Sequence, residues 1–346
     1  MSTPPISRSQ IDLADQILQR AYADGLFTHA AYALSVRGAT AARRAFGAAT
    51  METVFDLASL TKPVATATGA MQLVEQGRLH LLQPVRKFFE EEFGALPHLT
   101  DVEVHHLLTH TSGLPPIPKW PKDGADSERK AWLQAVLSTP LLRAPGVGYT
   151  YSDAGYILLG EILRRVSGMD QAALFRQGVT ERLSLPNIGY LPDASLRPRI
   201  APTSKDAAGT VHDPRSRDMG GVSGHAGLFG TTDDLIQYAE AIRGGGPPLL
   251  SRAATARMAV SQIPRTVGSQ SYGWFCAGND FLPKGDLFSD RSFGHSGFTG
   301  TLLLIDPEYE VSLVLLTNRV VNETEDGSRF LRVRRYLLNA MAAALV

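Results

Sequence analysis

The segment from Asp56 to Pro63 places a serine and a lysine three residues apart at the start of a predicted helix. Ser59 and Lys62 would lie on the same face of that helix. Pro63 fits the first turn, where its missing N–H is not needed. The positive end of the helix dipole disfavours a second positive charge, so a desolvated Lys62 could be neutral often enough to take a proton from Ser59. The same pattern also fits a capping serine followed by a surface lysine.

Two later segments carry side chains that could handle a proton or a substrate. Tyr151 and Asp153 stand where a loop enters a predicted helix, and a phenol there could pass a proton to a leaving group. His295 and Ser296 precede Gly297 at the start of a predicted strand, where a substrate could lie along the strand edge. Taken singly, the tyrosine could be an aromatic anchor and the histidine a hydrogen-bonded core residue.

The order Ser-x-x-Lys, Tyr-Ser-Asp and His-Ser-Gly resembles the three motifs of the serine β-lactamase and penicillin-binding superfamily. The pattern is most similar to the class C β-lactamase-like branch, which includes esterases and D-Ala-D-Ala carboxypeptidases. The resemblance extends from about residue 31 onward. The supporting segments are residues 107–114, 145–160, 220–229 and 294–318.

The resemblance implies a role for each motif residue. Ser59 would be the acylated nucleophile and Lys62 the proton acceptor. Tyr151 would share the role of the base and protonate the leaving group, with Tyr149 as a poor second choice because the Tyr-Ser-Asp register selects Tyr151. The backbone N–H groups of Ser59 and Phe298 would form the oxyanion hole.

The resemblance also implies that His295, Ser296 and Gly297 line the substrate edge, and Asp153 is expected to contact the substrate as well. Two positions depart from the family pattern, because Asp153 stands where an Asn is common and His295 where β-lactamases often carry Lys. Asp153 could pair with Lys62 or hold the neighbouring serine, and it would repel an anionic substrate. An unperturbed histidine is mostly neutral at pH 7. Both departures favour a neutral ester or amide over a β-lactam carboxylate.

The remaining histidines allow several interpretations. His106 and His110 have the spacing of a metal-binding pair but lack the Glu of a His-Glu-x-x-His motif. The resemblance implies a structural helix start there, and we expect no metal and no other cofactor. His225, in a glycine-rich loop, could contact the substrate or order the loop. His212 and Asp213 could form a loop hydrogen bond or part of the rim, and the sequence leaves both open.

The composition excludes several classes of protein. The chain has 346 residues with 34 basic and 34 acidic side chains, so its formal net charge is zero. With a pI near 7.1, it lacks the basic surface expected of a nucleic-acid binder or of a protein that docks on membranes through basic clusters. Apolar residues make up 44% of the chain, which is enough for a sizeable core. Cys276 is the single cysteine, so no intrachain disulfide forms.

The N-terminal residues lack a basic segment followed by an apolar one, and no stretch of about 18 uncharged apolar residues occurs. We therefore expect a cytoplasmic protein, or a periplasmic one if the sequence was trimmed. Its expected partner is a small-molecule ester, amide or lactam substrate. The oligomeric state stays open.

The elements that must position these residues fall into three parts of the chain. Helices are expected over residues 9–25, 59–76, 153–166, 231–244 and 327–345. Strands are expected over residues 31–36, 42–48, 293–305 and 311–317, the last two joined by a turn at 306–309. The middle, from about 79 to 219, is predicted to be mostly helices and loops.

This order agrees with the fold that the resemblance implies, a β-lactamase/DD-peptidase-like fold of the α/β class, α+β type. Both chain ends would build one antiparallel sheet flanked by the terminal helices, with a helical lobe inserted. We expect one catalytic domain over residues 1–346, with a sheet lobe of about 1–78 and 220–346 and a helical lobe of about 79–219.

The expected function is a serine hydrolase that forms an acyl-enzyme on Ser59, first a carboxylesterase for small or medium acyl esters. The alternatives are a D-amino-acid peptidase or carboxypeptidase, a weak β-lactamase, or a penicillin-binding sensor without turnover.

Overall fold

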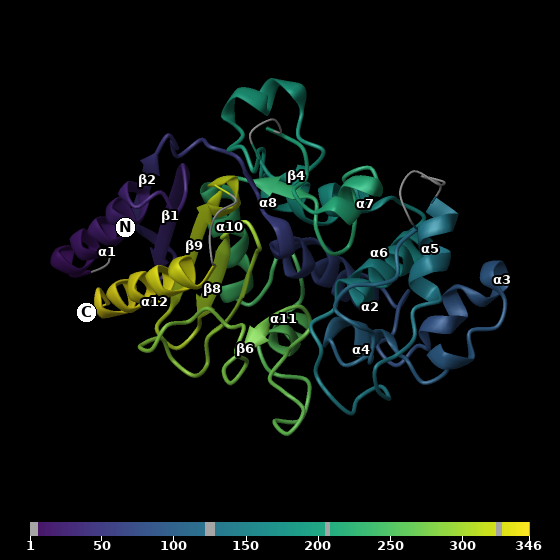
Figure 1. Cartoon of the computed structure of the whole chain (residues 1–346). Coiled ribbons are helices and arrows are strands. Elements are labelled where there is room, and N and C mark those ends of the chain that lie inside the picture. The colour runs from purple at the N-terminus through teal and green to yellow at the C-terminus, as the bar shows by residue number, and fades with distance from the viewer. Residues whose placement is uncertain (1–5, 122–128, 205–207, 323–326, 346) are drawn as a thin grey trace.

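The computed structural model describes residues 6–121, 129–204, 208–322 and 327–345. Its main feature is a six-stranded antiparallel sheet with the strand order β2-β1-β9-β8-β7-β6. The strands are β1 (His29–Val36), β2 (Ala39–Gly47), β6 (Phe275–Cys276), β7 (Phe293–Ser296), β8 (Leu302–Asp306) and β9 (Val311–Thr317). Because β1 pairs with β9, the two ends of the chain close one sheet (Figure 1).

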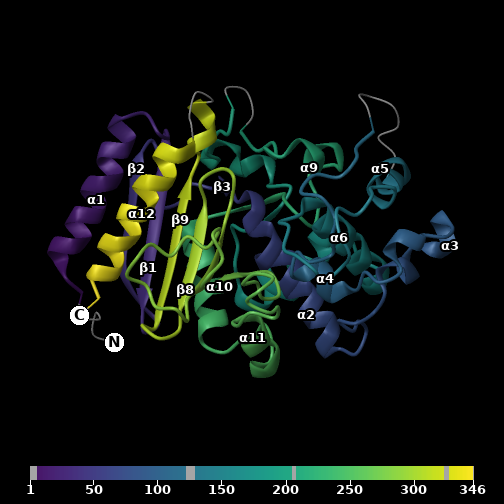
Figure 2. The same ribbon diagram turned by 60° about the horizontal axis from the view of Figure 1, so that its bottom comes forward.

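Helices cover both faces of this sheet (Figure 2). The terminal helices α1 (Arg8–Ala23) and α12 (Gly327–Ala343) pack together on one face, and α10 (Thr232–Arg243) packs on the other. Side chains alternate between the faces, so Tyr32 and Leu313 join the core under the terminal helices. Ala31 and Val314 join the core on the side of α10. Burial of both faces explains why β1 and β9 are almost continuously apolar.

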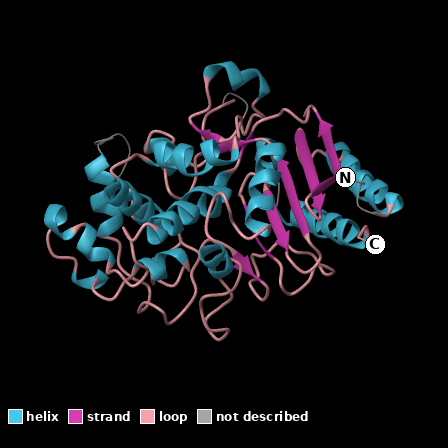
Figure 3. Ribbon diagram, turned by 180° about the vertical axis from the view of Figure 1, so that it is seen from behind, coloured by secondary structure: helices cyan, strands magenta, loops and turns pink. Residues whose placement is uncertain are grey.

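The other helices lie mostly to one side of the sheet (Figure 3). They are α2 (Thr68–Glu75), α3 (Glu90–Phe93), α4 (Val104–Leu108), α5 (Arg129–Leu137), α6 (Asp153–Ser167), α7 (Gln171–Phe175), α8 (Glu181–Leu183), α9 (Pro214–Asp218) and α11 (Arg252–Met258). A 3₁₀ turn, Ala58–Leu60, and a π-helical segment, Lys62–Ala67, lead into α2, which packs on α6. Among the described residues, no helix is long and apolar enough to cross a membrane.

A small second sheet joins segments that the sequence does not connect. It consists of β3 (Phe55–Asp56), β5 (Leu228–Gly230) and β4 (Gly189–Tyr190), in the order β3-β5-β4. Strands of two or three residues are too short to show a period-2 pattern, so the sequence gives no sign of them. This sheet places the chain just before Ser59 beside the chain that follows His225.

Several element predictions are confirmed. Helix α6 ends at Gly168, which adopts a left-handed conformation, and Thr231 caps α10 through a hydrogen bond to the Asp234 amide. The first helix begins earlier than predicted, because Ser7 rather than Ser9 stands at its N-cap.

The prediction of one strand over residues 293–305 is wrong. The chain reverses after Ser296, and β7 and β8 become antiparallel neighbours. Gly300 has φ +95°, and its N–H donates to the Gly297 carbonyl, which closes a tight turn. Apolar composition alone did not reveal this turn, which carries Phe298.

Asp306, buried between β8 and β9, holds the hairpin turn that the sequence predicts. Its carboxylate accepts hydrogen bonds from the Ser289 amide and hydroxyl at 2.7 and 2.8 Å, and from the Glu308 and Tyr309 amides at 3.0 and 3.1 Å. We predict that Asp306→Ala lowers the free energy of unfolding by about 2–4 kcal/mol, because these donors lose their acceptor. Urea unfolding measures this, with the exposed Glu308→Ala as control. A loss for Asp306→Ala no larger than that of the control would contradict the assignment.

Candidate active site

Ser59 follows a strained turn after β3. Ala58 has φ +47°, a left-handed conformation that is uncommon for a residue with a side chain. Buried Asp56 stabilises the turn, since its carboxylate accepts from the Ala58 amide at 2.8 Å and from the His212 amide at 2.7 Å. Burial raises the pKa of Asp56 to about 6 although these hydrogen bonds oppose the shift. The sequence does not single out Asp56, because a supporting carboxylate has no motif of its own.

The turn between β7 and β8 packs directly on the segment that leads to Ser59. Thr299 Oγ1 donates to the Asp56 carbonyl at 2.8 Å, and Thr301 Oγ1 donates to the Leu57 carbonyl at 3.1 Å. A Cβ atom on Gly297 would lie 2.7 Å from that same Leu57 oxygen, so only glycine allows this approach. The contacts bring the backbone of Phe298 to the same end of the site as Ser59, as the predicted oxyanion hole requires.

Lys62 occupies the centre of the site, and its side chain is 0% exposed. Its ammonium donates to Ser59 Oγ at 3.0 Å and to the His225 carbonyl at 3.0 Å. It also forms an ion pair with Asp153 Oδ1 at 2.7 Å. The phenol of Tyr151 interacts with both Lys62 and Ser59, and the ammonium lies 4.9 Å from the centre of its ring. The structure therefore brings together the serine, the lysine and the tyrosine that the three motifs singled out.

The charge of Lys62 differs from the sequence-based expectation. Burial by itself would lower the pKa of Lys62, but the Asp153 carboxylate and Tyr151 outweigh burial and raise it above its usual value. Lys62 is therefore an ammonium ion at neutral pH. The same ion pair lowers the pKa of Asp153 despite burial. The expected neutral lysine is wrong for this resting state, because the sequence did not show which partner Asp153 would choose.

Tyr151 is held by the start of helix α6. Ser152 caps this helix by accepting from the Gly155 amide at 3.2 Å, and the Ser152 amide donates to Nδ1 of His110 at 3.0 Å. The His110 ring lies 4.6 Å from the Tyr151 ring, centroid to centroid. Burial raises the pKa of Tyr151, so its phenol keeps its proton at neutral pH. Tyr149 instead donates to Gln270 at 3.3 Å, which leaves Tyr151 as the phenol of the site.

His110 thus supports the tyrosine loop rather than forming a metal site with His106. The Nδ1 atom of His106 accepts from the Glu103 amide at 3.1 Å as part of the capping of α4. His106 therefore binds the Glu103 amide, whereas His110 binds the Ser152 amide. This agrees with the predicted structural helix start, although the sequence did not show that His110 contacts Tyr151.

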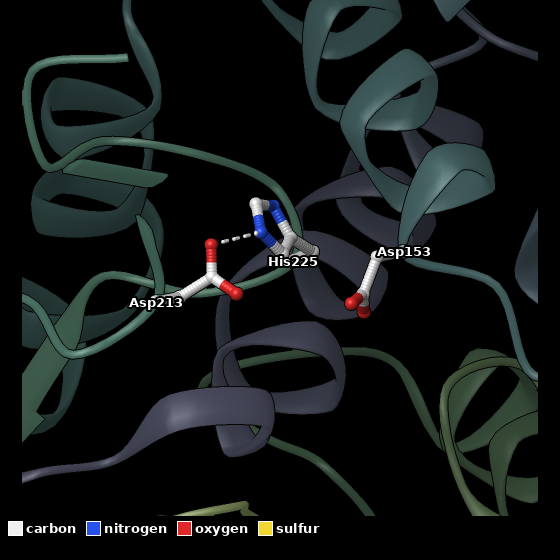
Figure 4. A group of neighbouring side chains, drawn as sticks. All are labelled: Asp153, Asp213 and His225. Carbon is white, nitrogen blue, oxygen red and sulfur yellow. Dashed lines mark hydrogen bonds and ion pairs between the residues drawn. The ribbon is translucent and has the colours of Figure 1, made fainter. Parts of the chain in front are cut away.

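His225 and Asp213 form a second polar unit near Asp153 (Figure 4). Ser223 Oγ lies 2.7 Å from Nδ1 of His225, and Nε2 donates to Asp213 Oδ1 at 2.8 Å. Burial would raise the pKa of Asp213, but the hydrogen bonds from His225 and from the Ser216 amide lower it well below its usual range. The sequence left Asp213 undecided, and the structure places it inside the site.

The carboxylates of Asp153 and Asp213 and the His225 ring have ligand atoms within 4.8 Å of one another. Such spacing could hold a metal ion, but the ammonium of Lys62 already lies 2.7 Å from Asp153 and supplies a positive charge there. A cation at this point would be repelled by Lys62. The donor set therefore fits a site built around Lys62 better than one built around a metal.

His295 lies behind Tyr151, with its side chain fully buried. Its ring stacks on Phe275 at 4.1 Å, and Nδ1 donates to the Ser296 carbonyl at 2.9 Å. Burial and the nearby Lys62 hold the pKa of His295 well below its usual value, so the ring is neutral. With the proton on Nδ1, Nε2 carries a lone pair and can only accept. Ser296 is partly exposed and Gly297 follows it at the strand end.

Comparison with known proteins now identifies the class. A family model described as "Beta-lactamase" matches residues 14–338, and the chain belongs to this family. It is a serine hydrolase with the β-lactamase/DD-peptidase fold, as the motifs and the sheet predict.

Among curated proteins, it is 30% identical over 318 residues to a protein of Escherichia coli K12 named "Putative D-alanyl-D-alanine carboxypeptidase". The match covers 81% of this chain and 72% of the relative. A Salmonella typhimurium protein of the same name is 29% identical, covering 78% of this chain and 70% of that one.

Solved structures of similar fold include "EstCE1, a hydrolase with promiscuous acyltransferase activity", with a TM-score of 0.77 and 23% identity. That comparison covers 96% of this chain and 99% of the other. An octameric penicillin-binding protein homologue from Pyrococcus abyssi has a TM-score of 0.76 and 22% identity, covering 96% of this chain and 77% of that one.

We predict that Asp153→Asn moves the acidic limb of the pH profile of kcat/KM to higher pH by at least about one unit. In the wild type this limb follows protonation of Asp153, whose pKa is lowered by Lys62 although burial opposes the shift. The amide of the variant cannot take a proton from Lys62, so the lysine must first lose its own proton and the limb follows the pKa of Lys62. Initial rates with p-nitrophenyl butyrate between pH 4 and 10 provide the measurement. An unchanged limb, or one displaced to lower pH, would show that Asp153 is not the partner that takes a proton from Lys62.

Proposed function

We propose that this serine hydrolase is a carboxylesterase that acts on small or medium acyl esters through an acyl-enzyme on Ser59. The observation that carries the proposal is the contact of Lys62 with Ser59 at 3.0 Å and with Asp153 at 2.7 Å. Tyr151 interacts with Ser59 and Lys62 in the same group. A nucleophile, a proton acceptor and a proton donor within one hydrogen-bonded group are what acyl transfer needs.

In the proposed acylation, Ser59 Oγ attacks the ester carbonyl while its proton passes to Lys62. Because Lys62 is charged at rest, it can accept this proton only as it gives one of its own to Asp153. Tyr151, which carries its own proton, then protonates the departing alcohol and recovers a proton from Lys62. Return of the proton from Asp153 to Lys62 restores the ion pair, so the net result is transfer of one proton from Ser59 to the alcohol. The N–H groups of Ser59 and Phe298 are the proposed donors to the oxyanion.

The charges around Ser59 favour a neutral substrate. Asp153 and Asp213 are anionic at neutral pH because their pKa values are lowered. His295, which stands where many β-lactamases carry Lys, is neutral and buried and offers no positive charge. A substrate carboxylate near these groups would meet repulsion rather than an ion pair. Ser296 and Gly297 are the proposed edge along which the neutral ester lies, with His225 beside it.

The second candidate is a D-amino-acid peptidase or carboxypeptidase, with weak β-lactamase activity as a variant of it. The names of the curated relatives favour this candidate. The same group of Ser59, Lys62 and Tyr151 would serve it, since amides and esters share the acyl-enzyme route. A penicillin-binding sensor would acylate Ser59 and stall, and intact mass after incubation with substrate separates this from turnover.

We predict that Ser59→Ala lowers the rate of p-nitrophenyl butyrate hydrolysis at least about a thousandfold, because the acylated oxygen is lost. A chelator leaves the wild-type rate unchanged, since no step depends on a metal. The measurement is the release of p-nitrophenol by both proteins with and without EDTA. Retained activity in Ser59→Ala would show that another residue is the nucleophile.

We predict that benzylpenicillin is turned over with a lower kcat/KM than p-nitrophenyl butyrate, because its carboxylate faces Asp153 and Asp213 without a cationic partner. Hydrolysis of the lactam ring at 240 nm and of the ester at 405 nm gives the two constants. A higher kcat/KM for benzylpenicillin would favour the second candidate over the esterase.

A further inference from the structure

We propose that Asp153 accepts the proton of the water that hydrolyses the acyl-enzyme, and that Asp213, fixed by His225, holds this water against it. The inference rests on the proposed function, since it concerns the second half of the same acyl-enzyme reaction. It gives Asp153 a catalytic role in place of the substrate contact that the sequence suggested.

The first argument is the position of the two carboxylates relative to Ser59. The ammonium of Lys62 contacts both Asp153 and Ser59, so a single group separates this carboxylate from the nucleophile. The side chains of Asp153 and Asp213 are each 22% exposed, whereas that of Lys62 is 0% exposed. Because Oδ1 of Asp153 is buried, Oδ2 is the oxygen of this carboxylate that water can reach, while the amine is closed to water. A carboxylate is therefore the better placed acceptor for the water proton.

The second argument is that Asp213 is held in one orientation. Its Oδ1 atom accepts from Nε2 of His225 and from the Ser216 amide, both at 2.8 Å, and Ser223 Oγ lies 2.7 Å from the other nitrogen of the same imidazole. Figure 4 shows the second oxygen of Asp213 on the side where Asp153 lies. With ligand atoms of the two carboxylates within 4.8 Å, one water molecule can donate a hydrogen bond to each.

The third argument is that the basicity of Asp153 changes during the step. In the resting site, Lys62 stabilises the charge of Asp153 and makes it a weak base. The water proton moves to Asp153 before the acyl group leaves. When Ser59 Oγ then takes a proton from the Lys62 ammonium, Asp153 loses its cationic neighbour, and its raised affinity for a proton keeps the water proton from returning to the tetrahedral intermediate.

The proton balance closes. The water oxygen bonds to the acyl carbon as one water proton moves to Asp153. The bond from the acyl carbon to Ser59 Oγ then breaks, and this oxygen takes a proton from Lys62. The products are the free acid, the serine hydroxyl, a neutral lysine and a protonated aspartate. Transfer of a proton from Asp153 to Lys62 across their 2.7 Å contact restores the resting ion pair.

The test measures acylation and deacylation separately in Asp153→Asn. Stopped-flow mixing with p-nitrophenyl butyrate, at a pH above the acidic limb of the variant where Lys62 is neutral, is expected to give a burst equimolar with active sites, followed by a steady rate lowered about 100-fold. Intact mass is expected to show a butyryl adduct that the wild type does not accumulate. Hydroxylamine, which needs no base to attack the ester, is expected to shorten the lifetime of this adduct in the variant.

Asp213→Asn provides a second variant that keeps the hydrogen-bond acceptor for His225 and Ser216. It is expected to slow deacylation less than Asp153→Asn does and to leave the burst rate within about twofold of wild type. The matched control is Asp233→Asn, at a partly exposed aspartate on α10 that pairs with Arg43. Both rates of this variant are expected to equal those of wild type.

The inference is overturned if Asp153→Asn deacylates at the wild-type rate, or if it loses the burst together with the steady rate while its melting temperature is unchanged. If Asp153→Asn does not fold, an unchanged deacylation rate in Asp213→Asn overturns it. Full activity in Ser59→Ala would instead reject the acyl-enzyme itself and with it the proposed function. Loss of activity in Ser59→Ala together with rapid deacylation in Asp153→Asn rejects only the present inference.

Discussion

The ammonium of Lys62 has no access to water, and such a charge is costly unless acceptors surround it. Three groups meet this need: the Ser59 hydroxyl from the same segment, and the His225 carbonyl and the Asp153 carboxylate from distant ones. Removing one partner of a buried ion pair leaves an uncompensated charge, which is far more harmful than losing a surface pair. The helix that carries Ser59, the start of α6 and the glycine-rich loop are therefore held in one arrangement by a single side chain.

The same ion pair sets the charges of its neighbours. His295 stays neutral because it is buried close to a permanent positive charge, and His110 stays neutral for the same two reasons. Tyr151 keeps its proton because it is buried, although Lys62 acts in the opposite direction. The group around Ser59 therefore starts with its protons on Lys62 and Tyr151, while Asp153 carries the negative charge. Acid–base chemistry from this state requires movement of protons within the group rather than a free lysine base.

Backbone geometry supplies the rest of the site. The left-handed Ala58 turns the chain so that Ser59 follows closely after β3. The Asp56 carboxylate stabilises that turn by accepting a hydrogen bond from the Ala58 amide. Gly297 lets the turn after β7 approach the Leu57 carbonyl, where any side chain would collide. These close backbone contacts join the six-stranded sheet to the segment that carries the nucleophile, and they position the Phe298 amide independently of its side chain.

The sequence by itself determined the motif residues, the helices α6 and α10 and the strands β1, β2 and β9. Helix caps and apolar runs depend on neighbouring residues, which is why local patterns reveal them. The structure alone decided that residues 293–305 fold into two strands, that a small sheet joins β3 to β5, and that Asp56, His110 and Asp213 belong to the site. It also decided the charge of Lys62, because the pKa of a buried group depends on which distant side chains surround it, and such contacts leave no periodic or local pattern in the sequence.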